Sequence, residues 1–292
     1  MSEIQRRSNL SLKEFNTEFV KTRTPVVITD AAHSWPAMKK WSVDWFHQNH
    51  GERNVHRRGD AESIQLKEHL DALETSTLEK PVRYLRNLNI QTDWPELLTD
   101  ITPRVAITDP DWLSSKLMPT GWPRVARHLN QLFISGKGTT IPLHFDEWMM
   151  HAFITNIDGH KEFTMYAPED AKYLYPKKDY YPVSEFPNPY EVDPIKYPLF
   201  CNAKAISIVV GPGESIFIPC GWWHTTRTHS TCISISSNFV NRHNWKLFRE
   251  EMLYMRDQQG ANRIKTKIIG VYLNVIGLII SISEFFRAPS KT

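Results

Sequence analysis

A histidine and an aspartate two residues apart, His144 and Asp146, are the residues whose types and spacing point most directly to chemistry. The sequence His144-Phe145-Asp146 is expected on a β-strand, where side chains two apart point to the same face and Phe145 points to the other. A second histidine, His224, follows a predicted strand at 215–218 and a bend at 219–221. In a closed or sandwiched β-fold this strand can bring His224 beside the first pair.

Two histidines and one carboxylate on one face form the facial triad that holds Fe(II) and leaves other coordination positions open. A 2-oxoacid can chelate through its carboxylate and ketone, and dioxygen can take the last position. The chain has twelve histidines, so an isolated His-x-Asp could arise by chance. The order His-x-Asp, then Gly-x-Lys161 on the next strand, then a Gly-Pro-Gly turn before Trp-Trp-His224, is far less expected by chance.

The motifs resemble the JmjC (cupin-like) hydroxylases, a resemblance that extends from about residue 10 to residue 245. Within that family the pattern is similar to the asparaginyl hydroxylase of hypoxia-inducible factor and to the wybutosine-pathway tRNA hydroxylase. The motifs that carry the resemblance are Pro142-Leu-His-Phe-Asp146, Asn156-Ile-Asp-Gly-His-Lys161, Gly211-Pro-Gly-Glu-Ser-Ile-Phe-Ile-Pro219 and Trp222-Trp-His224.

The resemblance implies a double-stranded β-helix that holds Fe(II) at His144, Asp146 and His224 and uses 2-oxoglutarate as co-substrate. It implies that the reaction converts 2-oxoglutarate to succinate and CO2. Further roles follow residue by residue: Lys161 and Tyr84 for the distal carboxylate of 2-oxoglutarate, Asn238 for a polar position near the metal, and Arg86 for a contact with the substrate or co-substrate. A solvated turn lysine, a half-buried strand tyrosine and an exposed arginine are the structural alternatives.

Two departures from the family pattern concern the co-substrate pocket. Ile141 stands three residues before His144, where the family often has Ser or Thr, so Thr140 becomes the candidate for that contact. The spacing from His144 to Lys161 is 161 − 144 = 17 residues, about two longer than expected, and the extra residues fall within 147–151. Trp148 in this stretch is a candidate substrate contact, whereas His151 is expected on the rim or in the core.

The pattern of short strands and turns predicts a mainly β fold, a jelly-roll or cupin core with flanking N-terminal and C-terminal helices. A capping box at Ser11–Glu14 starts the first helix, and residues 83–86 predict a strand. The predicted core strands are 132–135, 142–144, 152–157, 162–166, 205–210, 215–218 and 232–239. We expect a catalytic domain over 1–245 and a helical segment over 246–292, with 168–204 as an ordered insertion.

Composition and charge indicate an ordinary globular protein and argue against disorder. The 35 basic and 32 acidic residues leave a net charge of +3 without a long basic run, so nucleic acid binding is not indicated, although it is not excluded. The three cysteines show no disulfide spacing, and the N-terminus has no apolar signal core. A cytoplasmic location is therefore expected.

The apolar stretch 268–283 is the expected dimerisation surface. At about 16 residues it is shorter than the roughly 20 that a membrane-spanning helix needs. Membrane attachment is therefore disfavoured, although a helix on the membrane surface stays open. We expect a homodimer formed through the C-terminal helices.

Three functions remain open from the sequence. The first is hydroxylation of a C–H bond, most plausibly in a protein or peptide side chain, with N-methyl-lysine demethylation as a less favoured variant. The second is hydroxylation of a small metabolite or a tRNA base. The third is a cupin-like scaffold that binds metal or ligand without turnover.

Overall fold

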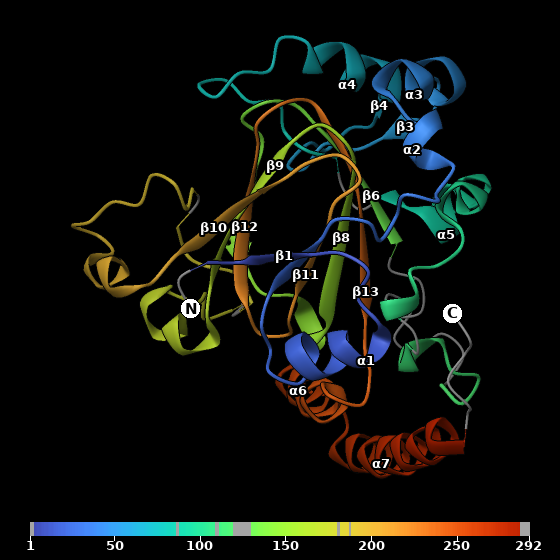
Figure 1. The fold of residues 1–292 in the computed structure, drawn as a ribbon. Helices are drawn as coiled ribbons and strands as arrows, with labels where there is room; N and C mark the ends of the chain where they lie inside the picture. The colour runs from blue at the N-terminus through green and yellow to red at the C-terminus, as the bar shows by residue number, and fades with distance from the viewer. Residues whose placement is uncertain are drawn as a thin grey trace.

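Two β-sheets face each other and form the centre of the molecule (Figure 1). The computed structural model describes residues 3–85, 88–108, 111–118, 130–179, 182–186 and 188–286. The larger sheet has the strand order β1-β2-β11-β8-β13-β6-β5, and the smaller sheet has the order β10-β9-β12-β7. The strands outside the eight-stranded core are β1 (Gln5–Arg7), β2 (Val26–Ile28), β5 (Leu88–Asn89) and the separate hairpin β3 (Asn54–Val55) and β4 (Ile64–Gln65).

Eight consecutive strands, β6 to β13, form the jelly roll. Their antiparallel ladders place β6, β8, β11 and β13 in the larger sheet and β7, β9, β10 and β12 in the smaller one. This arrangement confirms the predicted double-stranded β-helix with flanking helices. The bounds are β6 (Asn130–Ser135), β7 (Thr140–His144), β8 (His151–Asp158), β9 (Lys161–Tyr166), β10 (Ile206–Val210), β11 (Ser215–Ile218), β12 (Trp223–Thr228) and β13 (Cys232–Phe239).

The space between the two sheets is apolar in one half and polar in the other. Aliphatic and aromatic side chains from β8 to β11, among them Ile154, Phe163 and Ile216, form one buried cluster. Alternation along β13 gives Ser234 and Ser236 to the same interior, whereas Ile233 and Ile235 face the opposite side. A barrel filled only by aliphatic side chains would not need these hydroxyls, so the polar half is where a site is expected.

The N-terminal half covers the outer face of the larger sheet. Its helices pack Phe15, Phe46 and Leu70 against side chains such as Phe153 and Phe217 on the sheet. The capping box is confirmed, because Ser11 N–H donates to Glu14 and Glu14 N–H donates to Ser11 Oγ. The helices are α1 (Leu12–Glu14), the following π-helix (Phe15–Val20), α2 (Ala37–Lys40), α3 (Val43–His50), α4 (Leu66–Leu73) and α5 (Ile90–Asp93), followed by short 3-10 turns at Pro95–Ile101, Ala106–Thr108 and Trp112–Ser114.

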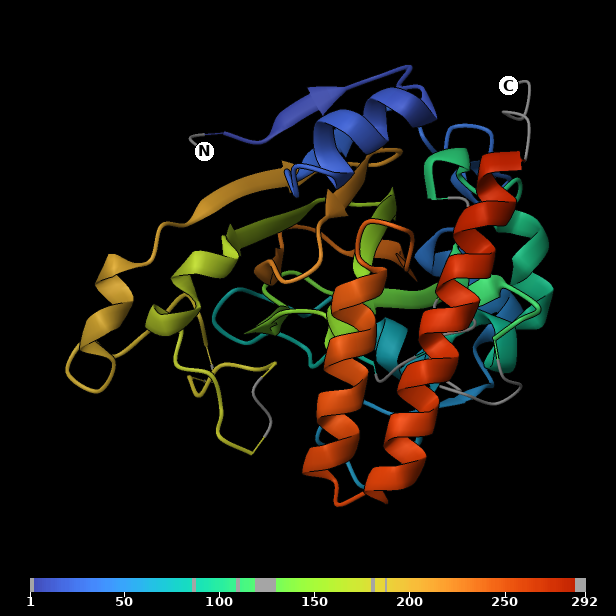
Figure 2. The ribbon, with the colours of Figure 1, turned by 90° about the horizontal axis from the view of Figure 1, so that it is seen from below.

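The chain ends in a helical hairpin of α6 (Trp245–Gln258) and α7 (Arg263–Phe286), which lie side by side in Figure 2. A second hydrophobic core joins the hairpin to the barrel. It contains Trp245, Phe248 and Leu273 from the hairpin, Trp112 from the segment before β6, and Met150 from the loop after β7.

The length of α7 corrects the sequence argument against a membrane span. The helix has 24 residues, because it propagates through Lys265 and Lys267 instead of starting at the apolar stretch. Among the described residues it is the one helix long and apolar enough to cross a membrane. The span Arg263–Glu284 contains an 18-residue window with a mean hydropathy of 1.7, and 28% of that window is buried. Length therefore does not decide between a membrane and a partner protein.

Two further sequence expectations differ from the structure. Residues 83–85 form no strand and have one isolated bridge, between Leu85 and Arg57. Strand β12 was not predicted at all, because its residues are mostly polar. The insertion after β9 carries 3-10 turns at Pro168–Tyr173 and Pro198–Asn202, and it covers a small cluster with Leu143 and Trp223.

Substitution of Gly277 by Ala is expected to destabilise the hairpin. A Cβ at Gly277 would lie 2.2 Å from Trp245 Nε1, closer than any real contact. The overpacking should lower the free energy of unfolding by about 1–3 kcal/mol, against a gain of about 1 kcal/mol in helix propensity. Chemical denaturation of the variant measures the difference.

Gly270→Ala is the matched control on the same helix. Its Cβ would meet Leu253 Cδ1 at 3.2 Å, the end of a flexible side chain, so the variant should be neutral or slightly stabilised. Equal effects of the two substitutions would contradict the close packing of Trp245 on α7.

Candidate metal centre

The pairing of β7 with β12 brings the two candidate histidines together. His144 and His224 are cross-strand partners, and their ring centroids lie 4.3 Å apart. Asp146 follows β7 by two residues. One ligand atom from each of His144, Asp146 and His224 lies within 4.8 Å of the others, and no other described residues form such a group of possible metal ligands. The structure therefore brings together the three residues that the sequence selected.

Backbone carbonyl groups set the orientation of both imidazole rings. His144 Nδ1 lies 2.8 Å from the carbonyl oxygen of Pro142, and His224 Nδ1 lies 3.2 Å from that of Trp222. A carbonyl can only accept, so each Nδ1 carries the proton and donates. The lone pair is then on Nε2 of each ring, which is the form in which neutral histidine binds a metal.

The electrostatics of His144 also favour a neutral ring. Burial is the main cause that lowers its pKa, to about 4; the neighbouring His224 lowers it further, and Asp146 opposes the shift. His144 is therefore unprotonated near pH 7 and needs no proton release to bind a cation. Two imidazole nitrogens and one carboxylate on one side fit Fe(II) with open coordination positions.

Lys161 is the second charged group of the barrel interior. Its cross-strand partner is Thr228 on β12, so Lys161 faces the same side of the smaller sheet as His224. The residue is only 3% exposed, and its Nζ donates to Ser234 Oγ at 2.6 Å. Among the described residues no carboxylate pairs with it, and burial lowers its pKa. Its other described contact is with the ring of Phe133, whose centroid lies 5.6 Å from Nζ. A buried ammonium group whose one described hydrogen-bond partner is a hydroxyl fits a ligand that brings its own carboxylate.

Tyr84 lies beside an arginine that the sequence did not single out. The guanidinium of Arg58 donates to the Tyr84 hydroxyl and lies 5.4 Å from the centroid of its ring. The charge of Arg58 is also close enough to contribute to the lowered pKa of His144. Arg58 is in a turn far from the motifs in sequence, so no local signal identified it. Arg86, the other candidate of this segment, lies outside the described residues.

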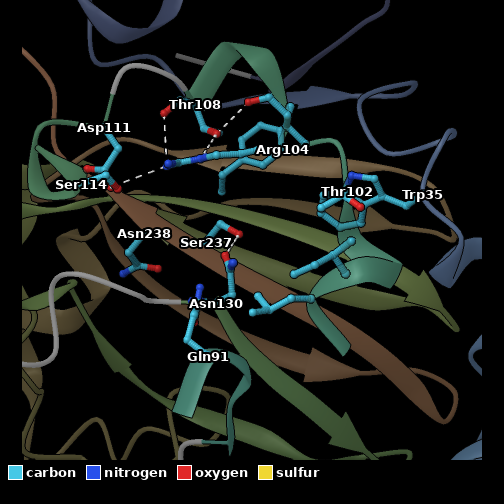
Figure 3. Close-up of a pocket in the computed structure, with 14 residues that line it drawn as sticks. Trp35, Gln91, Thr102, Arg104, Thr108, Asp111, Ser114, Asn130, Ser237 and Asn238 are labelled. Carbon is cyan, nitrogen blue, oxygen red and sulfur yellow. Dashed lines mark hydrogen bonds and ion pairs between the residues drawn. The ribbon is translucent and has the colours of Figure 1, made fainter. Parts of the chain in front are cut away.

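Asn238 and Thr140 take different positions. Asn238 ends the polar row of β13, and its Oδ1 accepts from Ser236 Oγ at 2.7 Å. Its side chain also lines a cavity shown in Figure 3. Thr140 is the cross-strand partner of Arg227, which faces away from the interior that holds His224. The register thus directs Ile141, not Thr140, towards the interior, and the expected contact of Thr140 with the co-substrate does not follow from it.

The loop after Asp146 has an unusual backbone. Trp148 and Met149 both have positive φ angles, 56° and 51°, which cost about 1 kcal/mol or more each for residues with a side chain. Asn244, buried at the start of α6, donates from Nδ2 to the carbonyl oxygen of Met149 at 2.8 Å. Met150 is buried in the second hydrophobic core, and Trp148 packs partly against it. The hairpin thus holds the strained loop that follows a candidate ligand.

His151 is a core residue, which is one of the two positions, rim or core, expected from the sequence. Its ring lies between Phe217 and Phe239 on the outer face of the larger sheet, and its Nδ1 accepts from the backbone N–H of Cys220 at 3.0 Å. Burial lowers its pKa to about 3. His151 therefore is not part of the metal centre.

Asn244→Asp is expected to weaken metal binding about tenfold or more, since groups that orient metal ligands contribute at that level. The aspartate still accepts from Asn241 N–H, but it loses the donor to Met149 and places an oxygen against that carbonyl. Competition titration with Co(II), together with its visible absorption bands, measures the affinity and the geometry at Asp146.

Asn241→Asp provides the control in the same turn, because Asn241 Oδ1 accepts from His243 N–H and does not contact the loop. Both variants place a new carboxyl group in a buried turn, so the free energy of unfolding should fall by a similar amount in each. If Asn241→Asp weakens Co(II) binding as much as Asn244→Asp, the contact with Met149 does not position the metal loop.

Comparisons with known proteins give similar sequences over most of the chain. A family model described as a cupin-like domain matches residues 12–244, which include His144, Asp146, Lys161 and His224. The lysine-specific demethylase JMJ21 of Arabidopsis thaliana is 27% identical over 254 residues, 83% of this chain and 26% of that protein. Lysine-specific demethylase 8 of Danio rerio is 30% identical over 241 residues, 77% of this chain and 55% of that protein.

The name of a third relative states two activities. The bifunctional arginine demethylase and lysyl-hydroxylase psr-1 of Caenorhabditis elegans is 24% identical over 265 residues, 82% of this chain and 61% of that protein. The chain therefore spans less than two thirds of the length of each of these three relatives.

Proposed function

This chain belongs to the cupin-like JmjC family, and from that premise we propose that it is an Fe(II)- and 2-oxoglutarate-dependent oxygenase. Fe(II) bound at His144, Asp146 and His224 would supply the activation of dioxygen, coupled to conversion of 2-oxoglutarate to succinate and CO2. The two histidines present unprotonated Nε2 atoms, and the carboxylate of Asp146 completes the face. A metal ion held by these three residues would keep other coordination positions for the co-substrate and dioxygen.

The observation that carries this proposal is the buried Lys161. A metal-binding scaffold without turnover has no need for a buried ammonium group whose described contacts are one hydroxyl and the face of the Phe133 ring, with no carboxylate. A dicarboxylate with one end at the triad and the other at Lys161 would satisfy both charges. Tyr84, held by Arg58, is a further donor that could serve the same carboxylate.

A protein side chain is the proposed substrate, and hydroxylation of one of its C–H bonds is the proposed reaction. The names of the relatives, which include lysine-specific and arginine demethylases and a lysyl-hydroxylase, support protein substrates. The same names favour demethylation as a second candidate. When the oxidised carbon is an N-methyl group, the hydroxylated product releases formaldehyde and leaves the amine with one methyl group fewer. Mass spectrometry of a substrate distinguishes gain of one oxygen atom from loss of a methyl group.

Lys161→Met is expected to raise the KM for 2-oxoglutarate about tenfold to a hundredfold, the contribution of a charge-assisted hydrogen bond. The methionine keeps the shape of the buried stem, so the fold should persist. Succinate formed from 2-oxoglutarate without added substrate is the readout, and His144→Ala should abolish it.

Lys13→Met, on the exposed face of α1, removes a lysine far from the barrel interior and should leave succinate formation unchanged. If the wild-type protein binds stoichiometric Fe(II) but forms no succinate above the His144→Ala level, the scaffold without turnover is the correct function.

We also propose a partner for the exposed face of helix α7. Its exposed apolar residues recur at alternating steps of four and three, each between 49% and 71% exposed: Ile264, Ile268, Val271, Val275, Leu278 and Ile282. This spacing is typical of a seam that packs against another helix, and a contiguous row of exposed apolar residues marks an interaction site. We propose that the seam packs against a second copy of the chain.

Val271→Glu combined with Leu278→Glu should convert the dimer into a folded monomer, because two carboxylates would enter the apolar seam. Light scattering measures the mass. Asn274→Glu, on the same helix but outside the seam, is the control and should remain dimeric. A monomeric wild-type protein, or one that floats with liposomes through α7, would contradict the proposed dimer.

A further inference from the structure

A cavity of about 230 Å³ lies between the outer face of the larger sheet and the chain segment that precedes β6 (Figure 3). Three side-chain amides line one side of it: Gln91 from α5, Asn130 from the start of β6, and Asn238 from the end of β13. None of the three metal ligands lines the cavity. Asn238 nevertheless links it to the barrel, because Ser236, its hydrogen-bond partner, belongs to the row of β13 that faces the interior.

The oxygen atom of each amide already accepts a hydrogen bond from the protein. Gln91 Oε1 accepts from the backbone N–H of Asn130 at 3.4 Å, Asn130 Oδ1 accepts from Ser237 Oγ at 2.6 Å, and Asn238 Oδ1 accepts from Ser236 Oγ at 2.7 Å. A backbone N–H can only donate, so the orientation of Gln91 is fixed. The NH2 group of Gln91 therefore remains as a donor, and with the serine hydroxyls donating as given, those of Asn130 and Asn238 point to the same wall with no printed acceptor among the described residues.

The other walls offer few free acceptors and no net charge. Arg104 lies 3.6 Å from the carboxylate of Asp111, and its guanidinium also donates to Thr108. The Asp111 carboxylate accepts from the backbone N–H groups of Leu113 and Val240 and from Ser114 Oγ. Because this ion pair is neutral overall and internally satisfied, it does not attract an isolated anion or cation.

The remaining wall is apolar. It consists of Leu98, Ile101, Val105 and the ring of Trp35, whose Nε1 donates to the carbonyl oxygen of Pro103 and is not available to a ligand. A ligand that fits must therefore present hydrogen-bond acceptors to one wall and apolar groups to the opposite wall, without charge. An extended peptide has this composition, because its carbonyl oxygens and its side chains project in different directions.

We propose that this cavity binds the uncharged backbone of an extended segment of the protein substrate, whose carbonyl groups accept from Gln91, Asn130 and Asn238. The inference rests on the proposed oxygenase function and extends it, since it assigns a site that selects peptides beside the barrel. A residue of the bound segment that lies past Asn238 is then directed towards the polar half of the barrel. Selection here depends on backbone carbonyls and small apolar side chains more than on charge.

The test uses N-acetyl trialanine N-methylamide, an uncharged peptide, as the probe on the Fe(II)-loaded protein under anaerobic conditions. Gln91→Glu and Asn130→Asp keep the oxygen that accepts within the protein and replace the NH2 donor by a second oxygen. Each should weaken binding of the peptide about threefold to tenfold, the contribution of one neutral hydrogen bond, measured by ligand-observed NMR titration. Gln258→Glu, exposed at the end of α6, adds the same charge elsewhere and should bind as the wild type does.

Two competitors test whether the cavity binds a small ion instead of an uncharged peptide. Acetate and methylammonium, an anion and a cation, should not displace the peptide. Displacement by either, unchanged affinity in both variants, or absence of peptide binding to the wild type would overturn the proposed site. Succinate formation without substrate is followed in parallel and should be equal in all four proteins. Its absence from the wild type would refute the oxygenase, whereas the binding titration alone decides the cavity.

Discussion

The cross-strand pairing of His144 with His224 is the constraint on which the centre depends. The two residues are 80 positions apart in the chain, yet the ladder between β7 and β12 places them directly opposite each other. A shift of the register by one residue would turn one ring to the outer face of the sheet. The β-bulge that follows this pair changes the register further along β7, so the pairing at the metal end is set separately from that at Thr140.

The neighbouring ladder between β12 and β9 shows which side chains share the barrel interior with His224. β12 contributes His224, Thr226 and Thr228 to the interior, and β9 pairs Met165, Phe163 and Lys161 with them. The apolar partners continue into the core of β8 to β11, whereas Lys161 lies at the end where Ser234 is available. An ammonium group at the apolar end would have no hydroxyl partner. Along this ladder His224 therefore lies at one end, opposite the apolar Met165, and Lys161 lies at the other end, opposite Thr228.

Sequence reasoning succeeded where a local rule determines the outcome. His144 and Asp146 bring their ligand atoms to one site, as their spacing predicted, although β7 ends at His144, and the capping box at Ser11 formed as its spacing predicted. It failed where the deciding partner is distant in the chain. β12 is too polar to be recognised as a strand, because its residues serve the site on one face and the insertion on the other.

Arg58 and Asn244 were not identified from the sequence for the same reason, because their partners are distant in the chain. Neither belongs to a motif, and each gains its role only from a tertiary contact, with Tyr84 or with Met149. Thr140 shows a different limit, because a β-bulge changes the face that simple counting assigns to it, and its contact with the co-substrate stays a prediction. Spacing along the chain predicts faces of regular strands, whereas loops, bulges and contacts between distant segments need the coordinates.

The loop 147–150, which follows Asp146, shares a hydrophobic core with the C-terminal hairpin. The hairpin is therefore part of the structural unit that supports the metal centre. The matched domain ends at residue 244, and Trp245, Phe248 and Leu273 lie beyond it. A chain cut at that border would retain every candidate ligand but leave Met150 and Trp112 facing water, a loss of about 1.5–3 kcal/mol for each large apolar side chain. The strained loop at Trp148 and Met149 would then relax towards ordinary backbone angles. The family match therefore ends before the residues that support the loop at the metal centre.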